Sequence, residues 1–238
     1  MRMRTSGKLA VMHPGRNLAA ATVLRSRKMP KFNTHCVDCP RLASHLAHVR
    51  ERCAGYFARP VPPFGDHQAR FLIVGLAPGM HGANRTGRPF TGDHAGILLY
   101  KTLHKFGFAS AKESVTAKDG LVLTNCRITN AVKCLPPENK PTTDEINTCN
   151  RFLRAELTSL PAASLILALG LVAHKATLKA LQLKQADYAF GHAALHDLPN
   201  GMRLLDSYHC SRYNTQTRRL TPPMFEKIFH QARQLIGA

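Results

Sequence analysis

The sequence predicts an α/β fold, a three-layer sandwich in which a four-stranded, mainly parallel sheet is flanked by helices. Two observations lead to this fold class. Short apolar runs rich in β-forming residues recur along the chain, as expected for strands that are covered on both faces. Segments with the apolar spacing of a helix alternate with these runs, and such alternation builds a parallel sheet between two layers of helices.

The expected strands follow in chain order. Residues 71–76 form a wholly apolar run and predict the first strand. Residues 121–124 and 128–132 predict either one bent strand or two pieces. Residues 164–169 and 203–207 predict the last two strands of the sheet.

Five helices are expected before, between and after these strands. The third begins after Thr142 or Thr143, either of which suits an N-cap, and it carries Asp144 and Glu145 in its first turn. The last begins with Pro222, because proline is favoured in the first turn of a helix. The predicted ranges are 42–53, 95–106, 143–157, 172–183 and 222–236.

We expect one domain over residues 31–238, because no linker in the chain is long enough to separate two domains. Residues 1–30 hold seven Lys and Arg and no acidic residue. An Arg-rich, acid-free start also occurs in organelle transit peptides. We favour a flexible basic tail that adds non-specific attraction to phosphate.

The composition points to a polyanionic partner. Lys and Arg number 33 against 14 Asp and Glu, which gives a formal net charge of +19. Such an excess repels itself in a folded protein and is tolerated most often where nucleic acid is bound. An anionic membrane surface is the second candidate, but the Arg residues are scattered through loops, whereas membrane binding would favour a basic amphipathic helix. No apolar run reaches the roughly eighteen residues of a membrane span, and no membrane partner is expected. Seven cysteines, an odd number without a secretory signal, argue against a disulfide framework.

Polar residues gather where three of the predicted strands end, in segments 75–93, 130–134 and 208–213. Ligands of such sheets bind at the carboxyl ends of the strands. The first segment is rich in glycine, which allows backbone to approach a ligand closely. A dinucleotide-binding loop is a weaker reading of it, because the G-x-G-x-x-G pattern is absent and Pro78 interrupts the turn.

Four cysteines suit a metal site. Cys36 and Cys39 are separated by two residues, which places two thiolates on one tight turn. Cys134 and Cys149 follow at the start and within the helix of a later excursion, and four thiolates close a tetrahedral site. The donor atoms alone do not separate zinc from iron–sulfur. Cys53 is the alternative ligand among the remaining cysteines.

Several motifs then occur together in one order. They are C-V-D-C-P-R-L at 36–42, G-R-P-F-T-G-D-H-A-G-I-L-L-Y at 87–100 with G-F-A at 107–109, I-T-N-A-V-K-C-L-P-P-E-N-K-P-T at 128–142, and S-Y-H-C-S-R-Y-N-T-Q-T-R-R-L-T at 207–221. With these motifs the chain resembles the family 5 (type B) uracil-DNA glycosylases from about residue 36 to residue 225.

The resemblance implies an α/β sandwich around a four-stranded parallel sheet. It implies an enzyme that flips a deaminated base out of DNA and hydrolyses its N-glycosidic bond. It also selects a [4Fe-4S] cluster over zinc, with Cys36, Cys39, Cys134 and Cys149 as ligands. Because the hydrolysis needs no electron, we expect the cluster to be structural.

The resemblance also suggests roles for individual residues. Phe90 stacks on the flipped base, unless it is a core phenylalanine. The Asn130 amide matches the O4 and N3–H edge of uracil, unless it only ends a strand in a turn. His209 stabilises charge on the leaving base. Asp93 positions water or steadies the cationic sugar, and it also suits the N-cap of the following helix.

The stretch from Gly75 through Ala77 lines the base pocket in this interpretation. Other glycosylase families carry a polar side chain here, and this chain has none. Broad-range family members share this feature, so hypoxanthine and xanthine join uracil as expected substrates.

The expected DNA contacts are the loop Ser211, Arg212 and Tyr213, which matches the segment that enters the minor groove, and Lys133 and Lys140, which are placed to brace a phosphate. Cys210 stands where the family motif usually has proline, which puts the rigidity of the loop in question.

The sequence therefore predicts a monofunctional DNA glycosylase that leaves an abasic site, because no lysine of the motifs is placed to form a Schiff base. We expect a monomer in the cytoplasm, associated with the nucleoid, acting on double-stranded DNA with single-stranded DNA as a further candidate. Two alternatives remain: a non-catalytic, metal-containing nucleic-acid-binding module, and a nucleotide-using α/β enzyme that acts on RNA.

Overall fold

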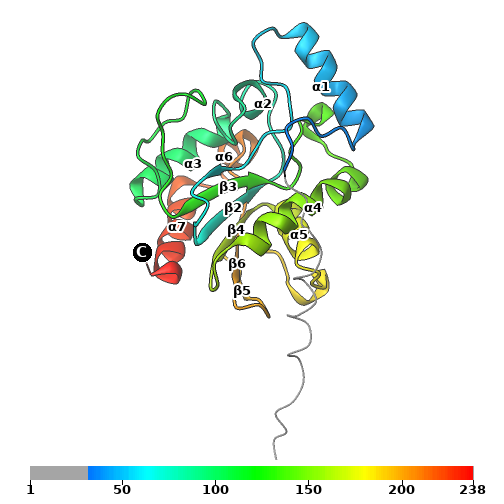
Figure 1. The fold of residues 1–238 in the computed structure, drawn as a ribbon. Coiled ribbons are helices and arrows are strands. Elements are labelled where there is room, and N and C mark those ends of the chain that lie inside the picture. Colours follow the sequence, from blue (N-terminus) through cyan, green and yellow to red (C-terminus); the bar gives the residue numbers. More distant parts are fainter. Residues whose placement is uncertain (1–31, 238) are drawn as a thin grey trace, which may run out of the picture.

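The computed structural model describes residues 32–237, which form one six-stranded sheet with helices on both faces (Figure 1). The four central strands are parallel, and a short antiparallel strand closes each edge. In spatial order the strands are β1 (Phe64–Gly65), β3 (Cys126–Asn130), β2 (Phe71–Gly75), β4 (Leu165–Leu169), β6 (Arg203–Ser207) and β5 (Leu195–Asp197).

The predicted fold class is confirmed, and the strand count is corrected from four to six. The four parallel strands are those expected from their apolar runs, although β3 begins at Cys126, earlier than predicted. Residues 121–124 are not a strand, because their pairing is limited to one bridge between Leu123 and Ala109. The two edge strands have only two and three residues and no fully buried position, so they carry no apolar run to mark them.

The five predicted helices are present, and two short ones join them. Thr142 is the N-cap of the third long helix: its hydroxyl accepts a hydrogen bond from the Glu145 N–H, and the Glu145 carboxylate accepts one from the Thr142 N–H. The helices are α1 (Pro40–Arg52), α2 (Ala83–Thr86), α3 (His94–Lys105), α4 (Thr143–Ser159), α5 (Leu171–Ala180), α6 (Arg212–Gln216) and α7 (Pro222–Ile236), with 3₁₀ turns η2 (Pro137–Asn139) and η3 (Gln185–Asp187).

Each face of the sheet has its own apolar core, because alternate strand residues point to opposite faces. Phe71 and Ile73 of β2 pack in one core with residues of α3 and α7. Leu72 and Val74 pack in the other with residues of α4 and α5. Figure 1 shows these helix pairs on opposite sides of the sheet, with α1 set apart beyond one end of the strands.

Residues 1–30, interpreted from sequence as a basic tail, lie outside the described residues, and that interpretation stays a prediction. Within residues 32–237, no helix combines the length and the apolar character needed to cross a lipid bilayer.

Candidate active site

The carboxyl ends of β2, β3 and β6 open into one cleft, which contains most of the residues that the sequence placed in the site. Parallel pairing sets Gly75 beside Asn130, and the chain leaves β6 toward His209 at the same edge. The predicted residues that line this cleft are Ala77, Phe90, Asp93, Asn130, His209, Ser211 and Arg212.

Gly75, also predicted to bind the base, does not line this cleft, but its missing Cβ leaves room for two residues that do. A Cβ atom at this position would lie 2.4 Å from Asn130 Oδ1 and 2.7 Å from Phe90 Cζ, closer than real Cβ contacts come. Asn130 is itself only 3% exposed, so its amide has little freedom to move aside. The glycine is therefore required where it stands, because a Cβ at this position would collide with both the amide and the aromatic ring.

Phe90 has an unusual backbone conformation. Its φ is 59°, a left-handed value that a bulky residue adopts only when its surroundings fix it. The Phe90 ring lies near that of His209, with 6.0 Å between ring centroids and 26° between planes. The two rings thus face the same part of the cleft in nearly parallel orientation.

Arg88 fixes the segment that carries Phe90. Its guanidinium is 2.6 Å from Asp119 Oδ2 and donates a hydrogen bond of 2.7 Å to the Ser114 hydroxyl. Its Nε donates a hydrogen bond of 2.8 Å to the hydroxyl of Thr91, the residue that follows Phe90 in the chain. The sequence analysis missed this role, because nothing near Arg88 in the chain indicates a carboxylate partner at position 119.

Asp93 occupies the N-cap position of α3, but its side chain makes no capping hydrogen bond, so the predicted capping role is wrong. Its Oδ2 instead accepts a hydrogen bond of 2.9 Å from the Ala83 N–H. Cβ atoms at Gly79 or Gly82 would lie 2.3 or 1.9 Å from Asp93 Oδ1, so these glycines make room for the carboxylate. Burial raises the pKa of Asp93, and the N–H groups of Ala83 and Gly79 oppose that rise.

His209 is neutral at physiological pH, because burial lowers its pKa to about 4. Its carbonyl accepts a hydrogen bond of 2.8 Å from the Asn214 side chain, and the Ser211 hydroxyl caps α6 by accepting from the Asn214 N–H. Cys210 is fully buried in the apolar core, so packing anchors the loop at the position where proline was expected.

The predicted DNA contacts divide into exposed and buried groups. Arg212 and Tyr213 are exposed on α6, and the Lys140 side chain is 80% exposed. Lys133 does not fit its predicted role. It is 1% exposed, and its ammonium is 2.6 Å from Glu156 Oε1 and hydrogen-bonded to the Thr129 hydroxyl, which removes it from any DNA phosphate.

The four cysteines predicted to bind a metal line one hollow. Cys36 and Cys39 precede α1, Cys134 follows β3, and Cys149 belongs to α4; Cys53 does not line this cysteine hollow.

Nearby donors face two of these sulfur atoms. The Lys133 N–H donates to Cys149 Sγ at 3.3 Å, and the Arg151 guanidinium donates to Cys36 Sγ at 3.8 Å. Burial first, and neighbouring thiolates second, raise the pKa of Cys39 to about 11. Such mutual repulsion makes a cationic group the natural partner of the four sulfurs in their thiolate form.

Sequence reasoning missed three further residues that line the cleft: His81, His94 and Asn139. His81 Nδ1 is 2.8 Å from the Tyr56 hydroxyl, and His94 Nε2 is 3.3 Å from the Thr215 hydroxyl. With 13 histidines in the chain, no spacing or motif singled these two out.

Comparisons with known proteins give a consistent result. The sequence profile of the Uracil DNA glycosylase superfamily matches residues 62–233. A type-5 uracil-DNA glycosylase of Thermus thermophilus is 47% identical over 86% of this chain and 95% of its own length. Those of Mycobacterium tuberculosis and Pyrobaculum aerophilum are 43% and 41% identical, over 85% and 83% of this chain and 78% and 88% of their own. A crystal structure of Pedobacter heparinus SMUG2 aligns with a TM-score of 0.47 and 17% identity, over 82% of this chain and 85% of that one.

We predict that Asp119→Asn removes a pH-dependent part of the stability. Burial opposes ionisation of Asp119, but hydrogen bonds from Arg88 and two backbone N–H groups outweigh it and lower the pKa from 3.8 to about 2. A carboxyl group whose pKa is lower in the folded state than in the unfolded state stabilises the fold at any pH above its unfolded-state pKa. That stability is lost as the pH falls toward the folded-state pKa. At neutral pH the free energy of unfolding should be higher for the wild type than for the variant, but by less than the full pKa shift would give, because solvent screens the pair at the exposed Asp119. The difference in the free energy of unfolding between wild type and variant should narrow as the pH falls from about 4 to about 2.

Urea unfolding over a pH series measures this difference. Glu51→Gln, at an exposed acid of α1, serves as the control and should follow the wild type. An Asp119→Asn profile parallel to that of the wild type at every pH would show that the Arg88 pair contributes nothing.

Proposed function

Because the chain belongs to the uracil-DNA glycosylase superfamily, we propose that the cleft at the ends of β2, β3 and β6 binds a uracil base flipped out of DNA. The chain is a DNA-repair glycosylase that removes uracil by hydrolysis. The observation that carries the proposed site is the close approach at Gly75, which brings the Asn130 amide and the Phe90 ring together at one end of the cleft.

Base recognition follows from the chemistry of these two side chains. The Asn130 amide offers one acceptor and two donors, which complement N3–H and O4 of uracil. The Phe90 ring offers an aromatic face on which an unstacked base rests. Because both side chains are held by burial, the pocket is formed before the base arrives and little ordering is needed on binding.

Bond cleavage separates charge, and the site has a group for each sign. As the C1′–N bond breaks, the base gains negative charge and the sugar becomes oxocarbenium-like. A neutral His209 imidazole donates a hydrogen bond to the base anion. The Asp93 carboxylate, whose pKa burial raises although the Ala83 and Gly79 N–H groups oppose that rise, steadies the sugar or orients the water that attacks C1′. Water adds hydroxyl to C1′, its proton leaves with the base, and an abasic site remains.

The DNA surface in this proposal is built around α6. Ser211, Arg212 and Tyr213 present one hydroxyl, one guanidinium and one exposed ring beside the cleft, and Lys140 adds a charge near η2. We assign double-stranded DNA as the main substrate, with single-stranded DNA as a second form to test. We further propose that the protein acts as a monomer in the cytoplasm, at the nucleoid.

We assign a [4Fe-4S] cluster to the cysteine hollow. A single zinc ion holds its sulfur ligands roughly 2.3 Å from the metal, so the sulfurs must lie within about 4 Å of one another. Among residues 32–237, His, Cys, Asp or Glu ligand atoms gather in threes within 4.8 Å only at a site without cysteine. The wider spread of Cys36, Cys39, Cys134 and Cys149 supports the larger group. When bound, the cluster would supply structure and no electron.

The central test is single-turnover excision with enzyme in excess, against duplexes that carry uracil, hypoxanthine, xanthine or mispaired thymine. Uracil release is expected, and hypoxanthine and xanthine are expected as further substrates because Ala77 places no polar side chain against the base. Cleavage of the DNA strand without added alkali would contradict a monofunctional hydrolase. Absence of any base release would favour a non-catalytic nucleic-acid-binding module.

We predict that His209→Ala slows uracil release about a hundred- to a thousand-fold, the usual cost of one donor to a developing anion. Duplex affinity should change little, since the donor acts in the transition state. The pH profile of the single-turnover rate should show no titration step due to His209 between about pH 5 and pH 8, because its pKa of about 4 keeps the ring neutral in that range. His104→Ala, at an exposed position of α3, is the control. A near wild-type rate for His209→Ala would refute the leaving-group role.

We predict that Asn130→Asp abolishes uracil excision and weakens duplex binding less, because a carboxylate cannot donate to uracil O4. The measurement pairs single-turnover rates with binding to an undamaged duplex. Asn200→Asp, in an exposed turn where the side-chain oxygen accepts from the Met202 N–H, keeps its hydrogen bond and should behave as wild type. Unchanged uracil excision by Asn130→Asp would show that Asn130 only ends the strand in a turn and does not bind the base.

We predict that Gly75→Ala lowers the excision rate strongly although it adds a single methyl group. The new Cβ would have to displace both the Asn130 amide and the Phe90 ring. Gly191→Ala is the matched control, because its Cβ would make only an ordinary contact of 3.7 Å with Ala194. Excision at the control rate, with the fold intact by circular dichroism, would show that Phe90 and Asn130 need not meet.

We predict that the purified protein contains iron and acid-labile sulfide, and that Cys36→Ser or Cys134→Ser reduces both together with soluble yield. Ligation is coupled to folding, so yield should fall more than the rate of the folded fraction. Cys53→Ser, outside the cysteine hollow, should keep full iron content. A colourless, active protein loaded with zinc would overturn the cluster assignment.

A further inference from the structure

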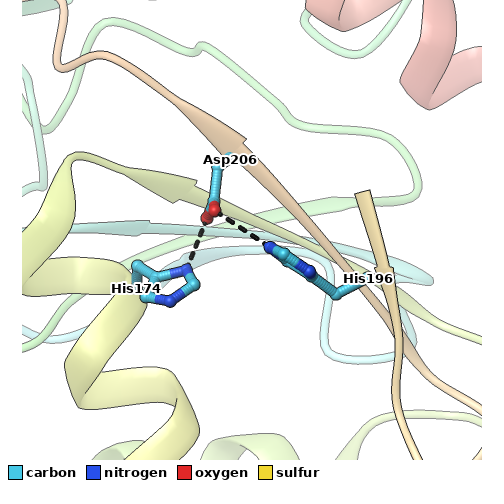
Figure 2. Close-up of side chains that lie close together, drawn as sticks. All are labelled: His174, His196 and Asp206. Carbon is cyan, nitrogen blue, oxygen red and sulfur yellow. Dashed lines mark hydrogen bonds and ion pairs between the residues drawn. The ribbon is translucent and has the colours of Figure 1, made fainter. Parts of the chain in front are cut away.

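A second cluster of ligand-type side chains consists of residues that do not line the cleft, and Figure 2 shows its three members. Asp206 is at the centre of this His–Asp–His cluster, on β6. His174 Nδ1, from α5, is 2.8 Å from Asp206 Oδ1, and His196 Nε2, from the edge strand β5, is 3.3 Å from Asp206 Oδ2. Asp206 is fully buried, and the His196 side chain is 15% exposed, so the cluster is internal with one side near solvent. None of the three residues lines the proposed base pocket.

The hydrogen bonds of His174 require a cation at this place. His174 Nε2 is 3.0 Å from the Tyr188 carbonyl oxygen, which can only accept, so Nε2 carries a proton. In a neutral ring Nδ1 then presents a lone pair, and that lone pair faces a carboxylate oxygen at 2.8 Å. Two lone pairs repel at this distance unless a proton or a metal ion lies between them.

The third member adds a second imidazole to the same carboxylate. If His174 and Asp206 share a proton, His196 is an ordinary hydrogen-bond donor to the other carboxylate oxygen, whereas a metal ion would take one ligand atom from each of the three residues. All three ligand atoms lie within 4.8 Å of one another. Two imidazoles and one carboxylate form a ligand set that borderline divalent metals prefer.

The surroundings also match those of metal-binding histidines. Such a histidine usually donates its other ring N–H to a carbonyl or carboxylate, which fixes the ring and its tautomer, as the Tyr188 carbonyl does for His174. Aromatic rings shield the cluster: Phe190 is 5.6 Å from His174 and Tyr188 is 5.7 Å from His196, between ring centroids. β5 is an edge strand of the sheet, and the His196 side chain that it carries is 15% exposed.

We propose that His174 Nδ1, His196 Nε2 and the Asp206 carboxylate bind one divalent transition-metal ion of the zinc class. The ion ties helix α5 and edge strand β5 to β6, the strand that leads to His209. Its role is structural. The site is independent of the cysteine hollow, since it uses nitrogen and oxygen donors and no sulfur.

Cobalt is the probe that separates the two sites. The full-length protein, as purified with its iron content and dialysed against a chelator, is titrated with Co²⁺ under anaerobic conditions. Binding at the His–Asp–His cluster gives visible d–d bands without sulfur-to-cobalt charge transfer, whereas binding at cysteine adds a charge-transfer band in the near ultraviolet. Zn²⁺ titration by calorimetry gives stoichiometry, and thermal unfolding with and without Zn²⁺ gives the linked stability.

Two variants test the assignment. Asp206→Asn keeps the fold, because the amide can donate to His174 Nδ1, but it loses the anionic ligand. His196→Gln removes the imidazole at the exposed side. Each should weaken binding by more than the roughly 10–100-fold that loss of an outer-shell partner costs. The zinc-induced rise in the unfolding midpoint should vanish in each. His230→Gln, at an exposed position of α7, is the control and should bind as wild type.

One equivalent of Co²⁺ with sulfur-free bands in the wild type, lost in both variants, establishes the site. Two results overturn it. One is a wild type that shows only sulfur charge transfer or no binding. The other is equal affinity in the wild type and both variants. In either case the cation between His174 and Asp206 is a shared proton. Neither result touches the uracil-excision assay, so the failure of this proposal and that of the proposed active site remain distinguishable.

Discussion

At Gly75 the parallel pairing of β2 and β3 brings the backbone so close to the Asn130 amide and the Phe90 ring that no side chain fits. The rest of the site follows from this contact. Asn130 can be buried at the end of β3 only because its neighbour lacks a Cβ. Phe90 reaches the same point only with a left-handed backbone, and Arg88 holds that backbone through its contacts on both sides. One missing methyl group thus links sheet register to the proposed base pocket.

The basic excess of the chain serves two physical purposes that composition does not separate. Arg88, Lys133 and Arg41 are each paired with a carboxylate, at 2.6, 2.6 and 2.8 Å, and the first two are buried. Buried ion pairs cost desolvation and fix geometry more than they add stability. These cations therefore hold loops in place and are not free to meet phosphate. The cations available to DNA are exposed ones such as Arg212 and Lys140.

Sequence could predict the features that depend on local pattern. Apolar runs and helical spacing predicted the parallel strands and the long helices, and the motifs singled out Phe90, Asn130 and His209, which the structure brings to one cleft. It failed where a role depends on a partner distant in the chain. Lys133 looked like a phosphate contact because Glu156 is invisible from its surroundings, and Asp93 looked like a helix cap because the glycine loop that receives its carboxylate lies ten residues earlier. The same separation hid His174, His196 and Asp206.

Two side-chain clusters outside the cleft are connected to the loops that form it. Ala77 and Val132 pack in the small apolar cluster that also contains Cys149, which connects the cysteine hollow to the loops after β2 and β3. Asp206 lies three residues before His209 on the continuous strand and loop of β6, which connects the His–Asp–His cluster to the remaining side of the cleft. Metal ligation at the cysteine hollow and at the His–Asp–His cluster would hold the loops after β2, β3 and β6 in place against the backbone strain at Phe90. A rigid site of this kind spends less binding energy on ordering the protein and leaves more for extracting the base from its stack.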